Sequence, residues 1–164
     1  MVTTTVSIIF TTLIYSKFLG QEEPRLLIKI MIGCFIIAAF FNFCFITDIY
    51  MLLKVNRNIF LAFFIFVPHG GGMAFAHNVP SVILAKITPS HVETTVFAFS
   101  TSVIKGSRQF GGFFFAIFLN RYFIGMTSNN LKDLDKAILI SVLFRLISLS
   151  YLNMLPTLEQ VTTV

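Results

Sequence analysis

The chain is poor in charged residues. Only 12% of its 164 residues are Asp, Glu, Lys or Arg, whereas 56% are hydrophobic, and the mean hydropathy is +0.87. A soluble domain carries about 25% charged residues because its surface faces water. With half that supply, this chain cannot cover a globule with polar groups. Its outer surface must therefore face lipid or protein.

The residues that build disulfide frameworks and metal sites are also scarce. The chain has three His and two Cys, and both cysteines, Cys34 and Cys44, lie in one apolar run. Disulfide frameworks and metal sites need more Cys or His at characteristic spacings, so we interpret both cysteines as packing residues. The chain also lacks the G-x-S-x-G, Walker and H-E-x-x-H motifs. We expect no enzymatic activity, catalytic site, cofactor or metal ion.

The net charge of +5 comes from twelve Lys and Arg residues that are scattered, mostly between apolar runs. Nucleic-acid binding instead needs basic residues clustered on one solvated face. We therefore expect no nucleic-acid partner. Anionic lipid head groups or an anionic solute fit this distribution better.

Long apolar runs dominate what is present. A helix needs about 20 apolar residues to cross the hydrocarbon core, and barrel strands would alternate every second residue instead. The pattern predicts an all-α, multi-pass membrane protein embedded in the lipid bilayer, a single transmembrane domain over residues 1–164 with about five helices. The expected segments are about 2–19, 26–47, 59–85, 90–123 and 136–155. The fourth would be about 50 Å long and must tilt, kink or protrude.

Three basic residues, Lys105, Arg108 and Arg145, fall far from the ends of these segments. Exposing all three to lipid would oppose insertion by about 8–10 kcal/mol. Helical spacing places Lys105 and Arg108 on one face with Thr101 and Gly112, and the same spacing groups Arg145 with serines at positions 141 and 148. Each helix therefore has one polar stripe that should face the bundle interior or a wet cavity.

The segments hold no Asp or Glu near their middles to balance these cations. Three interpretations follow. The stripes bind an anionic solute, they pair with carboxylates of another chain, or the long side chains snorkel to the interface.

His69, Met73 and His77 lie four residues apart on one face of the third segment. A metal pair needs two histidines at i and i+4, so the spacing of eight argues against metal binding. Proton coupling is one interpretation, and a satisfied or pore-facing histidine is the other. The adjacent run Gly70-Gly71-Gly72, like Gly111-Gly112, allows either close helix approach or local unwinding.

Ser90 and Glu93 form an S-x-x-E pattern ahead of an apolar run. This spacing predicts a capping box that opens the fourth helix. Glu93 could contribute to a gate in addition.

The stretch from Val79 to Gly112 carries a more specific pattern. It contains Val79-Pro80, an apolar stretch, Thr88-Pro89, then Val92-Glu93 and Phe97-Ala98, and the chain continues in order with Ser102, Gly106, Gly111-Gly112 and Leu155-Pro156. This order resembles the folate–biopterin transporter family, a branch of the major facilitator superfamily. That family usually has Met at position 79, Cys at 88 and Asn near 105.

The resemblance implies that the five helices correspond to the carboxyl-terminal five of a twelve-helix secondary transporter. It also implies folate- or pterin-like anionic substrates, which agrees with the cationic stripes. The candidate substrate contacts, chosen from their positions in the segments, are Lys105, Arg108, Arg145, His69, His77 and Glu93. Such transporters rock two halves around a central site, so we expect further amino-terminal helices or a partner membrane chain. The alternative is a non-transporting structural subunit of a larger membrane complex, derived from a transporter.

Overall fold

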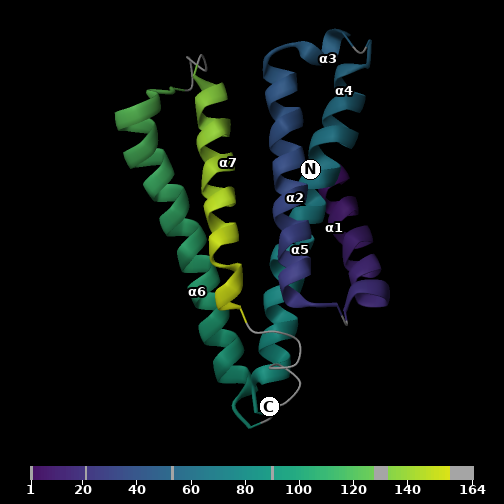
Figure 1. Cartoon of the computed structure of the whole chain (residues 1–164), viewed down its shortest axis with the longest axis vertical. Helices are drawn as coiled ribbons and strands as arrows, with labels where there is room; N and C mark the ends of the chain where they lie inside the picture. Colours follow the sequence, from purple (N-terminus) through teal and green to yellow (C-terminus); the bar gives the residue numbers. More distant parts are fainter. Residues whose placement is uncertain (1, 21, 53, 90, 128–132, 156–164) are drawn as a thin grey trace. The chain divides into compact units, whose positions relative to one another are not determined.

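The computed structural model describes residues 2–20, 22–52, 54–89, 91–127 and 133–155, and these residues form helices joined by short turns (Figure 1). Several helices continue without a break into π-helical turns. In chain order the elements are α1 (Val2–Ile14) with η1 (Tyr15–Leu19), α2 (Pro24–Ile46), α3 (Ile49–Leu52), α4 (Arg57–Phe60) with η2 (Leu61–Phe66) and α5 (Val67–Ile87), α6 (Glu93–Phe113) with η3 (Phe114–Ile124), and α7 (Leu134–Ser150) followed by η4 (Leu152–Met154).

The helix boundaries agree closely with the five predicted segments. Four of these helical stretches are long and apolar enough to cross a bilayer: Val2–Leu19, Pro24–Ile46, Arg57–Lys86 and Leu134–Met154. The stretch from α6 through η3 is helical as predicted, but it is not in this set. Within the described residues the number of candidate spans is thus four, one fewer than the sequence predicted.

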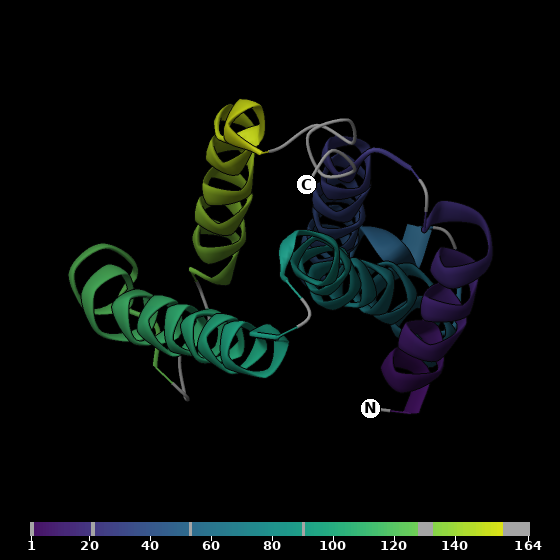
Figure 2. The same cartoon turned by 90° about the horizontal axis from the view of Figure 1, so that it is seen from below.

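The chain divides into two compact units. The first comprises Met1–Ile87 and Val142–Val164, and the second comprises Thr88–Ser141. In the first unit, α5 packs against both α1 and α2, which Figure 2 shows from below. These three helices form the framework that holds the candidate site.

The glycine run of α5 permits this close packing. A Cβ atom on Gly70 would lie only 2.7 Å from the Cβ of Ser7 and 2.9 Å from the backbone oxygen of Thr4, so α1 approaches α5 at its backbone. The Ser7 hydroxyl also donates a hydrogen bond of 2.8 Å to the carbonyl of Val67. The helix continues through all three glycines, so the run serves close approach and not unwinding.

Two clusters of buried apolar residues stabilise the first unit. Tyr15, Leu27, Phe75 and Val79 pack together where α1, α2 and α5 meet. The second cluster contains buried Cys44, Tyr50, Phe60 and Ile65, and the ring of Phe60 is fully enclosed. Cys44 is therefore a packing residue, as predicted, and both cysteines are free thiols.

In the second unit, α6 begins at Glu93 with Val92 as its N-cap and without a side-chain capping hydrogen bond. Ser90 of the predicted capping box lies outside the described residues, so the capping box stays a prediction. The Val92 side chain has no oxygen to offer the first backbone N–H groups, and the acidic Glu93 in the first turn favours the helix through its charge. Gly106, Gly111 and Gly112 have no neighbour within 4 Å of an added Cβ in the described structure, so close approach at Gly111-Gly112 is not seen there.

Candidate functional site

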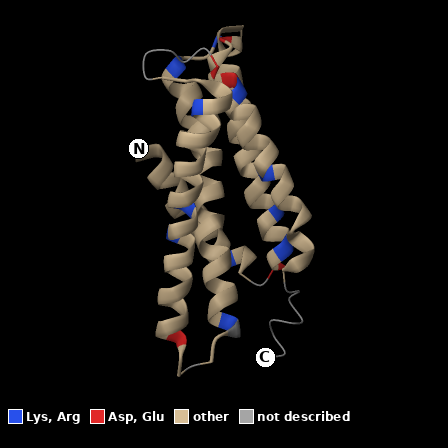
Figure 3. Cartoon of the chain, turned by 90° about the vertical axis from the view of Figure 1, so that its left-hand side faces the viewer, with Lys and Arg blue, Asp and Glu red and all other residues tan. Residues whose placement is uncertain are grey.

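Acidic and basic residues are distributed differently along the helices. Every described Asp and Glu lies in a turn or in the first turn of a helix, whereas Lys and Arg also occur along the helix shafts (Figure 3). The carboxylates thus lie at helix ends, as predicted. A desolvated Lys or Arg in the middle of a helix therefore needs a partner other than a carboxylate.

Within the first unit, Arg145 makes both a hydrogen bond and a cation–π contact with one residue, Phe35 of α2. Its Nη1 atom donates a hydrogen bond of 2.9 Å to the backbone oxygen of Phe35. Its guanidinium carbon also lies 4.9 Å from the centroid of the Phe35 ring. A helical carbonyl oxygen keeps a second lone pair after its helix bond, so α2 can accept this extra donor without breaking.

The magnitudes show why this arrangement is tolerated. A desolvated cation–π contact is worth about 2 kcal/mol, and a hydrogen bond from a charged donor about 1.5–3 kcal/mol. The insertion cost of one arginine is about 2.5–3.5 kcal/mol. The two contacts with Phe35 offset this cost without a carboxylate, and in the described structure no ion pair joins Arg145 to one. Its positive charge is held in place but not neutralised.

The ring of Phe35 also contacts α5. The His69 ring lies at 5.6 Å from it, with an interplanar angle of 64° in an edge-on arrangement. A Cβ on Gly72 would lie 2.9 Å from Cε1 of Phe35, so the ring rests directly against the α5 backbone. Phe35 therefore joins three elements of the first unit, α2, α5 and the carboxyl-terminal half of α7. We call Arg145, Phe35 and His69 the Arg145 cluster.

The structure brings together two of the six predicted site residues, Arg145 and His69. His77 lies exposed on α5, two turns beyond His69, and its backbone oxygen accepts a hydrogen bond from the Ser81 hydroxyl. Lys105, Arg108 and Glu93 belong to the other unit, where all three are exposed on α6.

The predicted serine stripe beside Arg145 has a local explanation. The hydroxyl of Ser141 donates to the carbonyl of Ile138, and that of Ser148 donates to the carbonyl of Phe144. Both hydroxyls thus bond to their own helix. Arg145, by contrast, donates its hydrogen bond to a different helix, α2.

Phe35 was missed by sequence reasoning. It is one of 21 phenylalanines, and nothing in its local sequence distinguishes it from the others. Its role depends on a backbone oxygen, which every residue has, and on its position opposite Gly72. The glycine run was the only available signal, because it indicated that some bulky side chain would lie against α5.

The Arg145 cluster has the groups needed to bind an anionic or aromatic ligand. A fixed guanidinium can donate to carboxylate or carbonyl oxygens, and the rings of Phe35 and His69 offer edges and faces for stacking. Within the described residues, no three His, Cys, Asp or Glu side chains come together in a way that could hold a metal ion.

Comparisons with known proteins bear on the identity of this chain. Neither curated protein sequences nor solved structures gave a match. A family model did match, and it covers residues 1–164. The motif from Val79 to Gly112 and the four apolar helices agree with this assignment, and with an integral, multi-pass membrane protein. The chain belongs to the BT1 family, the folate–biopterin transporters related to the major facilitator superfamily.

Proposed function

We propose that the chain is the carboxyl-terminal portion of a secondary transporter that moves folate- or pterin-like organic anions. In this proposal the solute contacts the Arg145 cluster. One observation carries the assignment: Arg145 is held by a neutral carbonyl and an aromatic ring at 2.9 Å and 4.9 Å, and its charge is left uncompensated.

The chemistry of the solute fits the cluster. A pterin is a flat heteroaromatic ring with carbonyl and amine groups, and folate adds carboxylates. The guanidinium offers several N–H donors in one plane, of which one is used on Phe35. The remaining donors can serve a carboxylate or a ring carbonyl, while Phe35 and His69 supply aromatic contact.

Other residues belong to the proposal on sequence grounds alone. Lys105 and Arg108 lie one turn apart in α6 and would add positive charge for the same class of solute. His77 would serve proton coupling, since imidazole titrates near neutral pH. Glu93 would contribute to a gate at the start of α6. Each can be tested separately from the Arg145 cluster.

One observation favours a second candidate function, a structural subunit of a membrane complex. The hydrogen bond from Arg145 to Phe35 joins α7 to α2 and so braces the first unit. In that case Arg145 would be needed for folding and assembly, and solute binding would not depend on it.

Uptake of labelled folate into membrane vesicles from cells that express the protein separates the two functions. Under the transport proposal, Arg145→Gln abolishes uptake per molecule of inserted protein, while insertion is retained. A matched control is Arg57→Gln, because Arg57 also stacks on a phenylalanine, Phe45 at 5.3 Å, but at the end of its helix. Unchanged uptake per inserted molecule in Arg145→Gln would defeat the proposal. A loss that merely follows the amount of folded protein would favour the structural subunit.

A further inference from the structure

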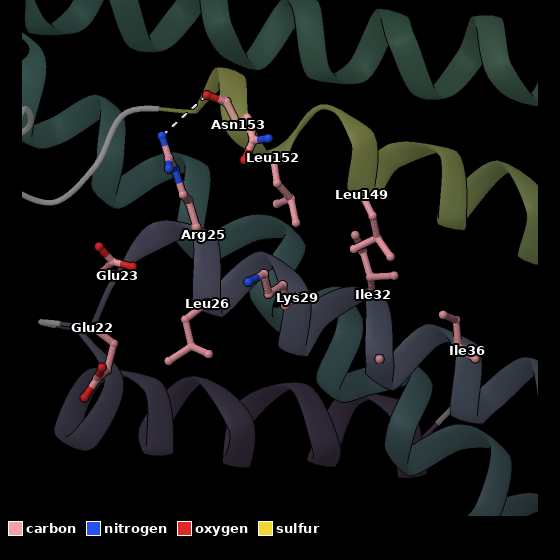
Figure 4. A pocket seen from close by; sticks show the side chains of 11 residues that line it. Glu22, Glu23, Arg25, Leu26, Lys29, Ile32, Ile36, Leu149, Leu152 and Asn153 are labelled. Carbon is pink, nitrogen blue, oxygen red and sulfur yellow. Dashed lines mark hydrogen bonds between the residues drawn. The ribbon is translucent and has the colours of Figure 1, made fainter.

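A groove of about 920 Å³ opens in the first unit between α2 and the end of α7 (Figure 4). Glu22 and Glu23 line it just before α2. On α2 the lining follows positions 25, 26, 29, 32, 33 and 36, which are spaced as one face of a helix. Leu149, Leu152 and Asn153 line the opposite side. None of these residues belongs to the Arg145 cluster.

The groove is polar at one end and apolar at the other. Glu22 and Glu23 lie just before α2 and Arg25 and Lys29 in its first two turns. Ile32, Gly33 and Ile36 follow further along the same helix. The distance from Arg25 to Ile36 along the helix is about 16 Å, close to the roughly 15 Å of one hydrocarbon leaflet. The polar end of the groove therefore matches the head-group region of one leaflet, and the apolar end matches its acyl-chain region.

Gly33 keeps the apolar part of the groove open. A Cβ built on this residue meets no described atom within 4 Å, in contrast to Gly70 and Gly72 of α5. A glycine in the interior of a helix costs about 1 kcal/mol relative to alanine. At this position the missing side chain leaves a channel beside α2.

The charges at the polar end are balanced but not paired. The two carboxylates and two cations sum to zero, and in the described structure no ion pair joins them. Arg25 instead donates to the backbone oxygen of Leu155 at 2.7 and 3.1 Å and to that of Asn153 at 3.4 Å. Because carbonyls do not cancel its charge, Arg25 adds to the positive field beside the exposed Lys29.

We propose that this groove binds a phosphatidylethanolamine molecule. Its phosphate contacts Lys29 and Arg25, its primary ammonium contacts Glu22 or Glu23, and one acyl chain lies past Gly33 between Ile36 and Leu149. A phosphatidylcholine has the same phosphate but a quaternary ammonium that cannot donate a hydrogen bond to a carboxylate. A purely anionic head group would meet the two carboxylates with repulsion. Charge complementarity thus selects the lipid with both a phosphate and a primary amine.

Native mass spectrometry of the protein released from nanodiscs tests this directly. The nanodiscs contain equal parts of phosphatidylethanolamine, phosphatidylcholine and phosphatidylglycerol with identical acyl chains. We expect retained phosphatidylethanolamine to exceed each of the other lipids by at least about tenfold, which is the lower end of the value of one charged hydrogen bond. Glu22→Gln combined with Glu23→Gln should abolish the preference over phosphatidylcholine, and Lys29→Gln should reduce retention of both.

Gly33→Leu should block acyl-chain binding and lower retention by a similar factor. Gly111→Leu is the matched control, because Gly111 is another helical glycine without a neighbour within 4 Å of an added Cβ, and it does not line the groove. Lys29→Gln, at an exposed position, keeps the test valid if Gly33→Leu does not fold. Equal retention of the three lipids, preferential retention of phosphatidylglycerol, or wild-type retention in both Gly33→Leu and Lys29→Gln would overturn the proposal.

Discussion

Gly72 and Phe35 are in direct contact across α5 and α2. A Cβ at Gly72 would lie 2.9 Å from Cε1 of Phe35 and 3.0 Å from two further ring atoms. The same ring contacts the Arg145 guanidinium and the edge of His69. The position of the proposed solute-binding arginine thus depends on the absence of a side chain on another helix.

Gly72→Ala should therefore weaken solute binding without preventing insertion. The added methyl group must displace the Phe35 ring, which weakens its cation–π contact of about 2 kcal/mol with Arg145. Loss of about half of this contact lowers folate affinity by about fivefold. Equilibrium binding of labelled folate to protein in nanodiscs measures this. Gly111→Ala, where the added atom meets nothing within 4 Å, should leave the affinity unchanged. Equal affinities for both variants would contradict the dependence on Phe35.

Gly70→Ala should destabilise the contact between α1 and α5. Its Cβ would lie 2.9 Å from the backbone oxygen of Thr4, which cannot move away as a flexible side chain can. We expect a loss of about 1–3 kcal/mol in the free energy of unfolding, measured by titration with a denaturing detergent. Gly33→Ala is the control, since it meets no neighbour and should gain up to about 1 kcal/mol of helix propensity. The reverse order of stability would show that α1 does not pack on α5 at this glycine.

Ser7→Ala should have a smaller effect at the same contact. The substitution removes the hydrogen bond from the Ser7 hydroxyl to the Val67 carbonyl at 2.8 Å, which is worth about 0.6–1 kcal/mol within a membrane protein. Because Ser7 lies beside Gly70, the two changes should not be additive. A double-mutant cycle with Gly70→Ala measures this coupling, and strictly additive losses would mean that the two contacts are independent.

Phe60→Ala should be the most destabilising single truncation in the aromatic cluster. The ring of Phe60 is fully enclosed and contacts the rings of Phe41, Phe45, Tyr50 and Phe64. Removing it leaves a cavity that costs about 3 kcal/mol. Phe63→Ala provides the comparison on the same helical stretch, because Phe63 is 66% exposed and should change stability by less than about 1 kcal/mol. Similar losses of stability for Phe60→Ala and Phe63→Ala would show that Phe60 is not a core residue.

The helices could be predicted from the sequence because the bilayer imposes their length and apolar character. The third segment, predicted at 59–85, runs as a continuous helical stretch from Arg57 to Ile87. The start of α6 was less predictable: the fourth segment was predicted from about residue 90, and the helix begins at Glu93 after Val92.

The candidate site was only partly predictable for a similar reason. Arg145 and His69 were recognised because a charge or an imidazole inside an apolar segment is conspicuous. Phe35 was not, since its contribution is a backbone oxygen and one ring among many. The groove beside Lys29 was also missed, because its polar end is built from the unremarkable start of a helix and from residues about 120 positions further along the chain.

The most direct test of the proposed function is the dissociation constant for folate of the wild-type protein and of Arg145→Gln, measured side by side in nanodiscs. Loss of one charged hydrogen bond of about 2 kcal/mol predicts an increase of about thirtyfold for Arg145→Gln. Arg145→Lys, which keeps the charge but not the planar donor set, should fall between the two. Arg57→Gln should bind as the wild type does. The same dissociation constant for wild type and Arg145→Gln, with both proteins folded, would contradict the proposal that Arg145 binds the anion.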